Sequence, residues 1–307
     1  MSCRAVAVIV PAHNEAPLIA ACLRSVREAA RHVAPLPVVV VVVADACSDA
    51  TATVAAEHGA VVLRIDDHNV GAARAAGARH TLRLLGDVAD ALWLAMTDAD
   101  TTVPDTWLTH QITWADQDYD AVLGTIRLAA SPPATTVRAA LHDAAYFHTR
   151  PPAGSAPWRH PHVHGANLGV AAAAYQHIGG FAELPTGEDH DLVTRLLASG
   201  HRIVRTDGHP VRTAARTSGR APGGLADLLA RLEVGGELAP SALNEQPVPT
   251  VPVGADLATG GGSASTDATI GTRLSDRGRR LADAGRGEVR TGVDAQHEPF
   301  PARNNAE

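Results

Sequence analysis

Short apolar runs alternate with longer amphipathic segments over about the first 130 residues of the chain. Four runs consist almost entirely of Val, Ile, Leu and Ala, which is typical of strands buried on both faces of a parallel sheet. The segments between them are rich in Ala, Leu and Arg, with apolar residues at helical spacing. We predict strands at residues 5–10, 37–43, 60–65 and 91–96, and helices at 16–31, 50–58 and 70–85. This alternation predicts an α/β fold, a doubly wound and mostly parallel sheet with flanking helices.

The pattern is less regular further along the chain. We predict strands at 121–130 and 201–206 and helices at 135–148, 184–199 and 224–233, with a loop rich in Pro, Gly and His at 150–163. From residue 235 onward, Gly, Pro and Ser replace the periodic pattern, and such a segment buries too little apolar area to offset its chain entropy. The sequence therefore predicts one domain over residues 1–234 and a disordered C-terminal tail over 235–307, with a transient helix at 274–284.

Charge and composition exclude several classes of function. The 307 residues carry 26 basic and 33 acidic side chains, and every basic one is Arg. A chain without Lys has no Schiff-base lysine and no lysine-type phosphate loop. A net charge of −7 argues against non-specific binding of nucleic acid. The three cysteines lack metal-ligand spacing, no apolar run is long enough to cross a membrane and no signal peptide is evident, so we expect a cytoplasmic protein without a transmembrane segment.

Polar and acidic segments follow each of the first four predicted strands. In an open parallel sheet the ligand binds beyond the carboxyl ends of the strands, so these segments are expected to share one site. Carboxylates two residues apart, such as Asp98 and Asp100, suit Mg²⁺ or Mn²⁺ bound together with substrate phosphates. No G-x-G-x-x-G follows the first strand, which argues against a dinucleotide-binding domain. The four segments are residues 11–15 (PAHNE), 45–49 (DACSD), 66–69 (DDHN) and 97–101 (TDADT).

Taken in order, these segments and two later ones resemble the motifs of the family 2 glycosyltransferases, which have the GT-A nucleotide-sugar fold. Residues 11–15 look like P-x-x-N-E, residues 43–49 like V-D-D-G-S-x-D, and residues 69–77 like N-x-G-x-x-x-A-R-N-x-G. Asp98 and Asp100 occupy the place of the D-x-D metal motif, residues 164–167 that of the loop before the acceptor helix, and residues 187–189 that of the E-D pair. The resemblance covers residues 4 to about 220. Ala44 and Ala46 stand where the family has Asp and Gly, and no Q-x-x-R-W signature of processive synthases is present.

The resemblance implies a metal-dependent glycosyltransferase that moves a sugar from a nucleoside-diphosphate sugar to an acceptor hydroxyl. It implies inversion by single displacement, with Asp189 as the base and Glu188 beside it. The implied donor-binding residues are Pro11, Glu15, Asp45, Asn69, Arg74 and Asp98. The implied acceptor-binding residues are His164, Gly165, Ala166 and Asn167, and the implied ligands of Mg²⁺ or Mn²⁺ are Asp98, Asp100 and His209.

Structural interpretations of the same residues stay open at this point. Asp45 and Asp49 could cap the following helix, and Glu188 and Asp189 could be first-turn residues that the helix dipole favours. Arg74 could be a solvated helix-face residue. The histidines of 160–164 could bind zinc, although they lack a Cys partner. Arg212, Arg216 and Arg220 could bind a diphosphate or lie on a solvated strand edge. The alternative functions are a nucleotidyltransferase and a non-catalytic nucleotide-sugar binding protein.

Overall fold

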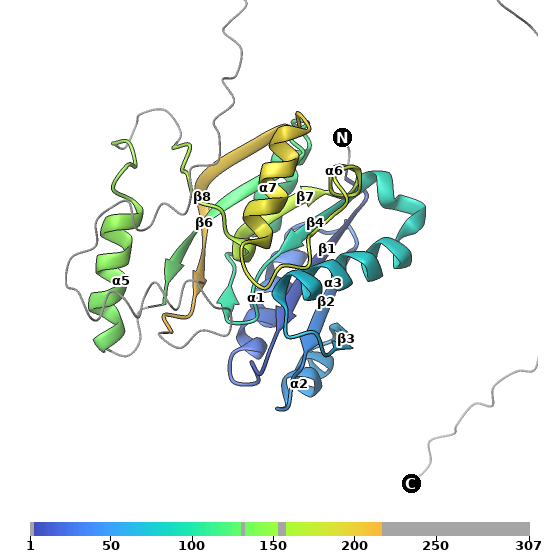
Figure 1. Ribbon diagram of the computed structural model, residues 1–307, viewed down its shortest axis with the longest axis horizontal. Helices are drawn as coiled ribbons and strands as arrows, with labels where there is room; N and C mark the ends of the chain where they lie inside the picture. The colour runs from blue at the N-terminus through green and yellow to red at the C-terminus, as the bar shows by residue number, and fades with distance from the viewer. Residues whose placement is uncertain (1–2, 130–132, 153–157, 217–307) are drawn as a thin grey trace, which may run out of the picture. The chain divides into compact units, whose positions relative to one another are not determined.

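The computed structural model describes residues 3–129, 133–152 and 158–216 (Figure 1). In this part of the chain the strands form one eight-stranded sheet in the order β3-β2-β1-β4-β7-β6-β8-β5. The strands are β1 (Ala5–Ala12), β2 (Val38–Asp45), β3 (Val61–Ile65), β4 (Leu92–Met96), β5 (Thr101–Thr102), β6 (Ala121–Leu128), β7 (Leu168–Ala171) and β8 (Ile203–Thr213). The helices predicted at 224–233 and 274–284, and the tail predicted from 235, lie outside the described residues.

The first four strands confirm the predicted parallel α/β architecture. β1 is the central strand of this half, parallel to β2 on one side and to β4 on the other. All eight residues of β1 and all five of β4 are buried, which explains their continuous apolar character. Because the strands run parallel, their carboxyl ends and the polar segments that follow them meet at one edge of the sheet.

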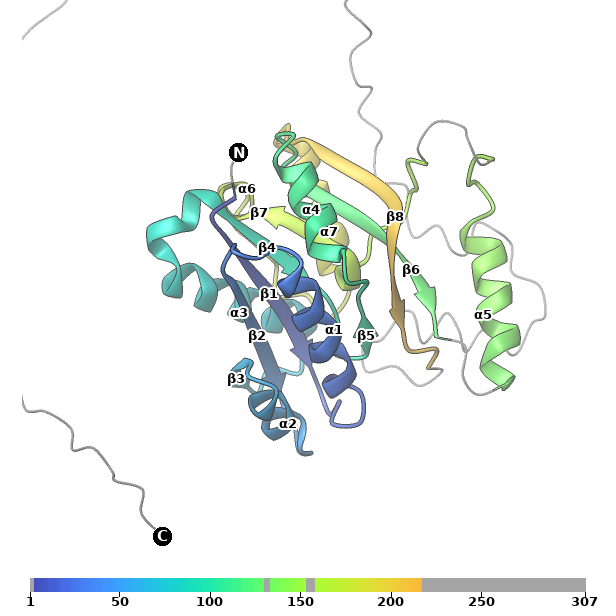
Figure 2. The ribbon, with the colours of Figure 1, turned by 180° about the vertical axis from the view of Figure 1, so that it is seen from behind.

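Helices cover both faces of this sheet. α3 (Val70–Leu84) and α7 (Glu188–Ala198) lie over the face seen in Figure 1, whereas α1 (Ile19–Arg31) and α4 (Trp107–Ala115) lie over the face seen in Figure 2. The largest side chains of the core, Trp93 and Trp107, are fully buried. The other helical elements are α2 (Thr51–Glu57), α5 (Pro133–Tyr146), α6 (Ala172–His177) and the 3₁₀ turns η1 (Gly86–Ala91) and η2 (Gly165–Asn167).

The second half of the sheet differs from the prediction in detail. β7 runs antiparallel to both of its neighbours, β4 and β6, and β5 is antiparallel to β8. β8 extends to Thr213, well beyond the predicted end at residue 206, and pairs in parallel with β6 across a register shift. No strand was predicted for β5 or β7, because two and four residues are too few to show a period. Within the described residues, no helix has both the length and the apolar composition that crossing a bilayer requires.

Candidate active site

The loops after β1 and β2 are joined by hydrogen bonds at the carboxyl edge of the sheet. The Asn14 side-chain oxygen accepts from the backbone N–H of Ser48 at 2.8 Å and from that of Asp49 at 3.2 Å. Three residues that follow strands here are in the left-handed region although none is glycine: Asn14 (φ 52°), Ala46 (φ 50°) and His68 (φ 49°). Such backbone conformations cost free energy and cluster at binding sites. The sharp turns therefore mark this edge as the candidate site.

Two of the predicted acidic residues shape these loops. Both carboxylate oxygens of the buried Asp45 accept backbone N–H groups after β3, from Asp67 at 2.8 Å, His68 at 2.9 Å and Asn69 at 2.7 Å. Asp49 accepts from the backbone N–H of Thr51, the first residue of α2, at 2.9 Å, although the N-cap position of this helix is Ala50. Pro11 lies inside β1, in register with Val43. The roles of Asp45 and Pro11 toward a donor stay predictions.

The Asn69 motif attaches α3 to the segment that leads into α7. Asn69 caps α3 by accepting from the backbone N–H of Ala72 at 2.9 Å, and its amide donates to the carbonyl of Glu183 at 3.0 Å. Gly71 donates its N–H to the carbonyl of Leu184 at 3.2 Å, and a Cβ at Gly71 would stand 2.4 Å from the carbonyl oxygen of Ala182. Only glycine permits this approach.

Arg74 is the centre of a buried charge network. It is 3% exposed, so it is not a solvated helix-face residue. One terminal nitrogen lies 2.6 Å from Asp98 Oδ1, and the other pairs with Glu188 Oε1. A Cβ at Gly165 would lie 2.4 Å from the guanidinium carbon, so the backbone of η2 packs directly against this cation. Arg74 thereby links the D-x-D motif, the E-D pair and the predicted acceptor loop.

Asp189 is the carboxylate of the E-D segment that faces this loop. Its Oδ2 accepts from the backbone N–H of Gly165 at 2.7 Å, and its Oδ1 accepts from that of His190 at 2.8 Å. Asp191 instead pairs with Arg195, whose Nε lies 2.9 Å from Asp191 Oδ2. Of the carboxylates at the start of α7, Glu188 is therefore committed to Arg74 and Asp191 to Arg195.

The carboxylate of Asp100 is held by hydroxyl groups from two strands and by an arginine side chain. Its Oδ1 accepts from the hydroxyl groups of Thr101 and Thr213, each at 3.3 Å, and its Oδ2 pairs with Arg216. Burial raises the pKa of Asp98 above its ordinary value, against the lowering by Arg74, and Asp100 and Asp189 raise it further. The site therefore concentrates negative charge at the end of β4.

This donor set fits a divalent cation shared with a substrate. Mg²⁺ is usually bound by one or two carboxylates together with substrate phosphates, and Asp98 and Asp100 supply two carboxylates. Over residues 3–129, 133–152 and 158–216, no group of three or more His, Cys, Asp and Glu side chains is arranged to hold a metal ion. His209 stacks on His110 with ring centroids 3.9 Å apart and contacts Thr106 Oγ1 at 3.1 Å. Its assignment as a third ligand stays a prediction.

The predicted acceptor loop is tied into the fold through Asn167. Its amide donates to the carbonyl oxygens of Thr125 at 2.9 Å and His209 at 3.0 Å, and its side-chain oxygen accepts from Trp107 Nε1 at 2.9 Å. Ala166 and Gly165 are buried beside it. Within this loop, Gly165 reaches Asp189 through its backbone, whereas Asn167 fixes the loop to β6, β8 and α4.

The histidines before this loop form a stack of rings. His162 lies on Tyr146 with centroids 3.6 Å apart, and His160 and His164 continue the stack at 5.9 and 6.1 Å from His162. Their Nε2 atoms contact the carbonyl oxygens of Leu123 and Tyr146 and the Tyr146 hydroxyl. Among the described residues no such cluster is arranged for a metal, so the zinc interpretation finds no support. The stack fixes the loop to β6 and α5.

We expect this stack to make the fold sensitive to acid. Burial lowers the pKa of His160 and of His162 to about 4. Between pH 6.5 and 4 the unfolded chain binds protons at these rings and the folded chain does not, so the free energy of unfolding falls as the pH falls. The loss should reach about 2 kcal/mol per histidine by pH 5. Urea unfolding at pH 7 and 5 measures it: His162→Gln should flatten the dependence, and the same change at the exposed His148 should not.

The fold and the comparisons with known proteins define the class. The structure resembles the mannosyltransferase PcManGT from Pyrobaculum calidifontis, solved with GDP-Man and Mn²⁺, with a TM-score of 0.51 and 23% identity over 72% of this chain and 59% of that one. It also resembles S. aureus TarS 1–349, solved with UDP-GlcNAc, with a TM-score of 0.52 and 14% identity over 78% of this chain and 70% of that one. The architecture is thus that of the GT-A glycosyltransferases.

The sequence profile of glycosyl transferase family 2 matches residues 7–179, more than half of the chain. The chain therefore belongs to glycosyl transferase family 2, as its motifs predicted. No curated protein matches the chain. The chain spans less than two thirds of the length of PcManGT.

Some contacts of the site had no signal in the sequence. Thr213 reaches Asp100 from 113 residues away, and Arg74 meets Glu188 across 114 residues. Only the topology, which sets β8 beside β5 and α7 beside α3, brings these residues together. The backbone N–H of Gly165 carries no side-chain signature at all.

Proposed function

We propose that this protein is an inverting, metal-dependent glycosyltransferase that transfers a sugar from a nucleoside-diphosphate sugar to an acceptor hydroxyl, with Asp189 as the base. The observation that carries the proposal is the position of Asp189. Its carboxylate accepts a hydrogen bond from the backbone N–H of Gly165. Gly165 packs against Arg74, and Arg74 pairs with Asp98 of the D-x-D motif. The proposed base and the acidic motif on the donor side are thus connected through the buried guanidinium of Arg74.

In this reaction Asp189 accepts the proton of the acceptor hydroxyl while the oxygen attacks the anomeric carbon. The bond from that carbon to the diphosphate breaks, and the nucleoside diphosphate leaves. A carboxylate within hydrogen-bond reach of the hydroxyl is suited to this role. Glu188 pairs with Arg74, so we assign it the positioning of α7 and not proton transfer.

On the donor side, we assign Asp98 and Asp100 to a divalent cation, Mg²⁺ or Mn²⁺, bound together with the diphosphate. When bound, such a cation neutralises charge that develops on the leaving diphosphate. Glu15 lies at the same edge, where it shares Arg216 with Asp100. That PcManGT is solved with GDP-Man and Mn²⁺, and TarS with UDP-GlcNAc, supports a nucleotide-sugar donor and a cation here. We place the reaction in the cytoplasm.

A panel of UDP-sugars and GDP-sugars, each with and without Mn²⁺, tests the proposal. A ligand that binds only the folded state raises the melting temperature by mass action. One donor family should raise it in the presence of Mn²⁺, and slow release of the free nucleoside diphosphate should accompany it. If every donor leaves both the melting temperature and the free diphosphate unchanged, the proposed reaction is wrong.

Asp100→Asn is expected to abolish the Mn²⁺-dependent part of nucleotide binding. The amide keeps the shape of the side chain and loses the charge that a cation requires, while Thr101 and Thr213 still fix its position. Calorimetric titration with UDP or GDP, with and without Mn²⁺, measures the effect. Asp90→Asn, an exposed position in η1, is the matched control and should behave like wild type. Unchanged Mn²⁺-dependent affinity in Asp100→Asn would contradict the cation assignment.

A further inference from the structure

Arg216 places one cationic group against two acidic residues of the candidate site. A single terminal nitrogen of Arg216 lies 2.8 Å from Glu15 Oε1 and also pairs with Asp100 Oδ2. Both carboxylates are nearly buried, with side chains 8% and 11% exposed. Since both oxygens contact the same atom, they face a common point, and that point holds positive charge.

The surroundings direct Asp100 toward this point. Its other oxygen accepts from the hydroxyl groups of Thr101 and Thr213, and its backbone carbonyl accepts from the N–H of Ala214 at 3.2 Å. The carboxylate is therefore fixed between β5 and β8, with Oδ2 facing the guanidinium. Glu15 is fixed by its backbone N–H, which donates to Thr51 Oγ1 at 2.7 Å.

Asp100 Oδ2 cannot serve the guanidinium and a divalent cation in the same way at once. Both are positive and both need the oxygen at contact distance, so they repel each other if they share it. Without a positive partner, the nearly buried carboxylates of Glu15 and Asp100 would carry uncompensated negative charge, which is costly. The guanidinium and the divalent cation must therefore exchange at Asp100.

We propose that Arg216 is the internal competitor of the divalent cation: its guanidinium holds Asp100 and Glu15, and the cation gains Asp100 only when Arg216 leaves. This inference rests on the cation assignment of the proposed function. It makes the apparent affinity for the metal lower than the two carboxylates alone would give, because binding includes the cost of breaking the Arg216 contacts. Arg216 thereby controls when the donor site takes up its cation.

Binding of Mn²⁺ alone, without nucleotide, tests this in the full chain. Free Mn²⁺ is measured by electron paramagnetic resonance during titration of wild type, Arg216→Ala, Arg216→Gln and Arg212→Ala. Arg212 is exposed near the end of β8, four residues before Arg216, and its removal controls for the general gain in negative charge. Both Arg216 variants should bind Mn²⁺ at least tenfold more tightly than wild type, and Arg212→Ala should not. Adding Asp100→Asn to Arg216→Ala should remove the gain.

Equal Mn²⁺ affinity in wild type and both Arg216 variants would overturn the proposal, as would an equal gain in Arg212→Ala. The glutamine variant fills the space of the arginine and guards against a folding defect in the alanine variant, and melting curves verify both. Turnover of nucleotide sugars is a separate readout. If the protein turns over a nucleotide sugar and the Arg216 variants show no gain in Mn²⁺ affinity, the competition is wrong and the glycosyltransferase reaction stands. If the variants gain Mn²⁺ affinity and no donor is turned over, the competition stands and the proposed reaction is wrong.

Discussion

Asp189→Asn is expected to reduce sugar transfer by about 10² to 10⁴-fold, the usual contribution of a general base. The amide oxygen can still accept from Gly165, so the loop should stay in place, but the side chain no longer takes a proton. The loss should therefore appear in kcat, while the affinity for the donor stays within a factor of about two. The measurement is initial-rate kinetics with a working acceptor, together with donor binding by calorimetry.

Two neighbours serve as controls for this variant. Asp191→Asn removes a carboxylate that pairs with Arg195 within α7, so it should keep most of the transfer rate. Glu188→Gln disturbs the contact with Arg74 and should lower both stability and rate, by less than Asp189→Asn lowers the rate. An active Asp189→Asn beside an inactive Asp191→Asn would place the base at position 191.

Arg74→Met is expected to lower the free energy of unfolding by about 3 to 5 kcal/mol, because it leaves the buried Glu188 without its cationic partner. Met keeps much of the length of the side chain, so the loss is chiefly electrostatic. For a domain of this size the change corresponds to a fall in Tm of roughly 10 °C. Urea unfolding at pH 7 measures it.

The same helix supplies the matched control. Arg79 is 60% exposed and lies 3.6 Å from Glu183, so Arg79→Met should change stability by less than about 0.5 kcal/mol. Arg74→Met combined with Glu188→Gln should recover part of the lost stability, since the unpaired charge is then gone. Additive effects of the two substitutions would show that the pair is not coupled, contrary to the contact in the structure.

The first half of the fold was predictable because most of its strands carry buried apolar runs. In β1, β2 and β4 the run is continuous and largely buried, and in the partly exposed edge strand β3 it is interrupted by Arg64 alone. The helices between these strands end close to the predicted residues. The second half is mixed: β8 carries Arg205, Asp207 and Arg212 and is half-buried along most of its length, so its pattern resembles that of a loop. Strands of this kind are fixed by pairing with their neighbours, here β6 and β5, which local sequence does not report.

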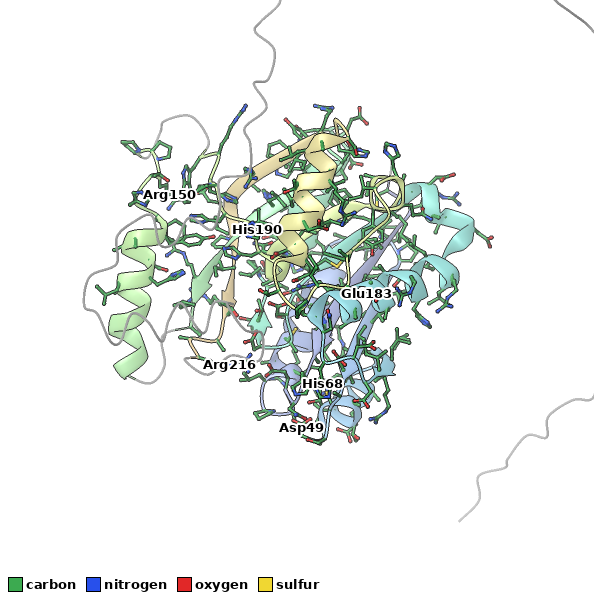
Figure 3. All side chains as sticks on the ribbon, viewed as in Figure 1. Asp49, His68, Arg150, Glu183, His190 and Arg216 are labelled. Atoms are coloured by element: carbon green, nitrogen blue, oxygen red, sulfur yellow. The ribbon has the colours of Figure 1, made fainter. Side chains whose placement is uncertain are left out.

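The site was predictable as a set of motifs and not as a set of contacts. Asp98, Asp189 and Arg74 were each identified from their segments, and the structure brings them into one network. The sequence could not distinguish residues that bind a ligand from residues that support the fold. Asp45, Asn69 and Asn167 all matched binding motifs, yet the side chain of each hydrogen-bonds to groups of the fold. Arg216, labelled in Figure 3 and predicted as part of a basic stretch with Arg212 and Arg220, pairs with Glu15 and Asp100 of the site, whereas Arg220 lies outside the described residues.

The close contact between Gly165 and Arg74 has a consequence for protein engineering. The segment of α7 that carries the proposed base cannot be transferred alone, because Asp189 accepts from the backbone N–H of Gly165, which itself packs against the guanidinium of Arg74 from α3. A graft of residues 187–191 into another scaffold would carry the carboxylate and lose its geometry. The smallest unit that could be transplanted with its chemistry intact comprises three separate stretches of chain, centred on Arg74, Gly165 and Asp189, and a redesign that changes one of them must reoptimise the other two.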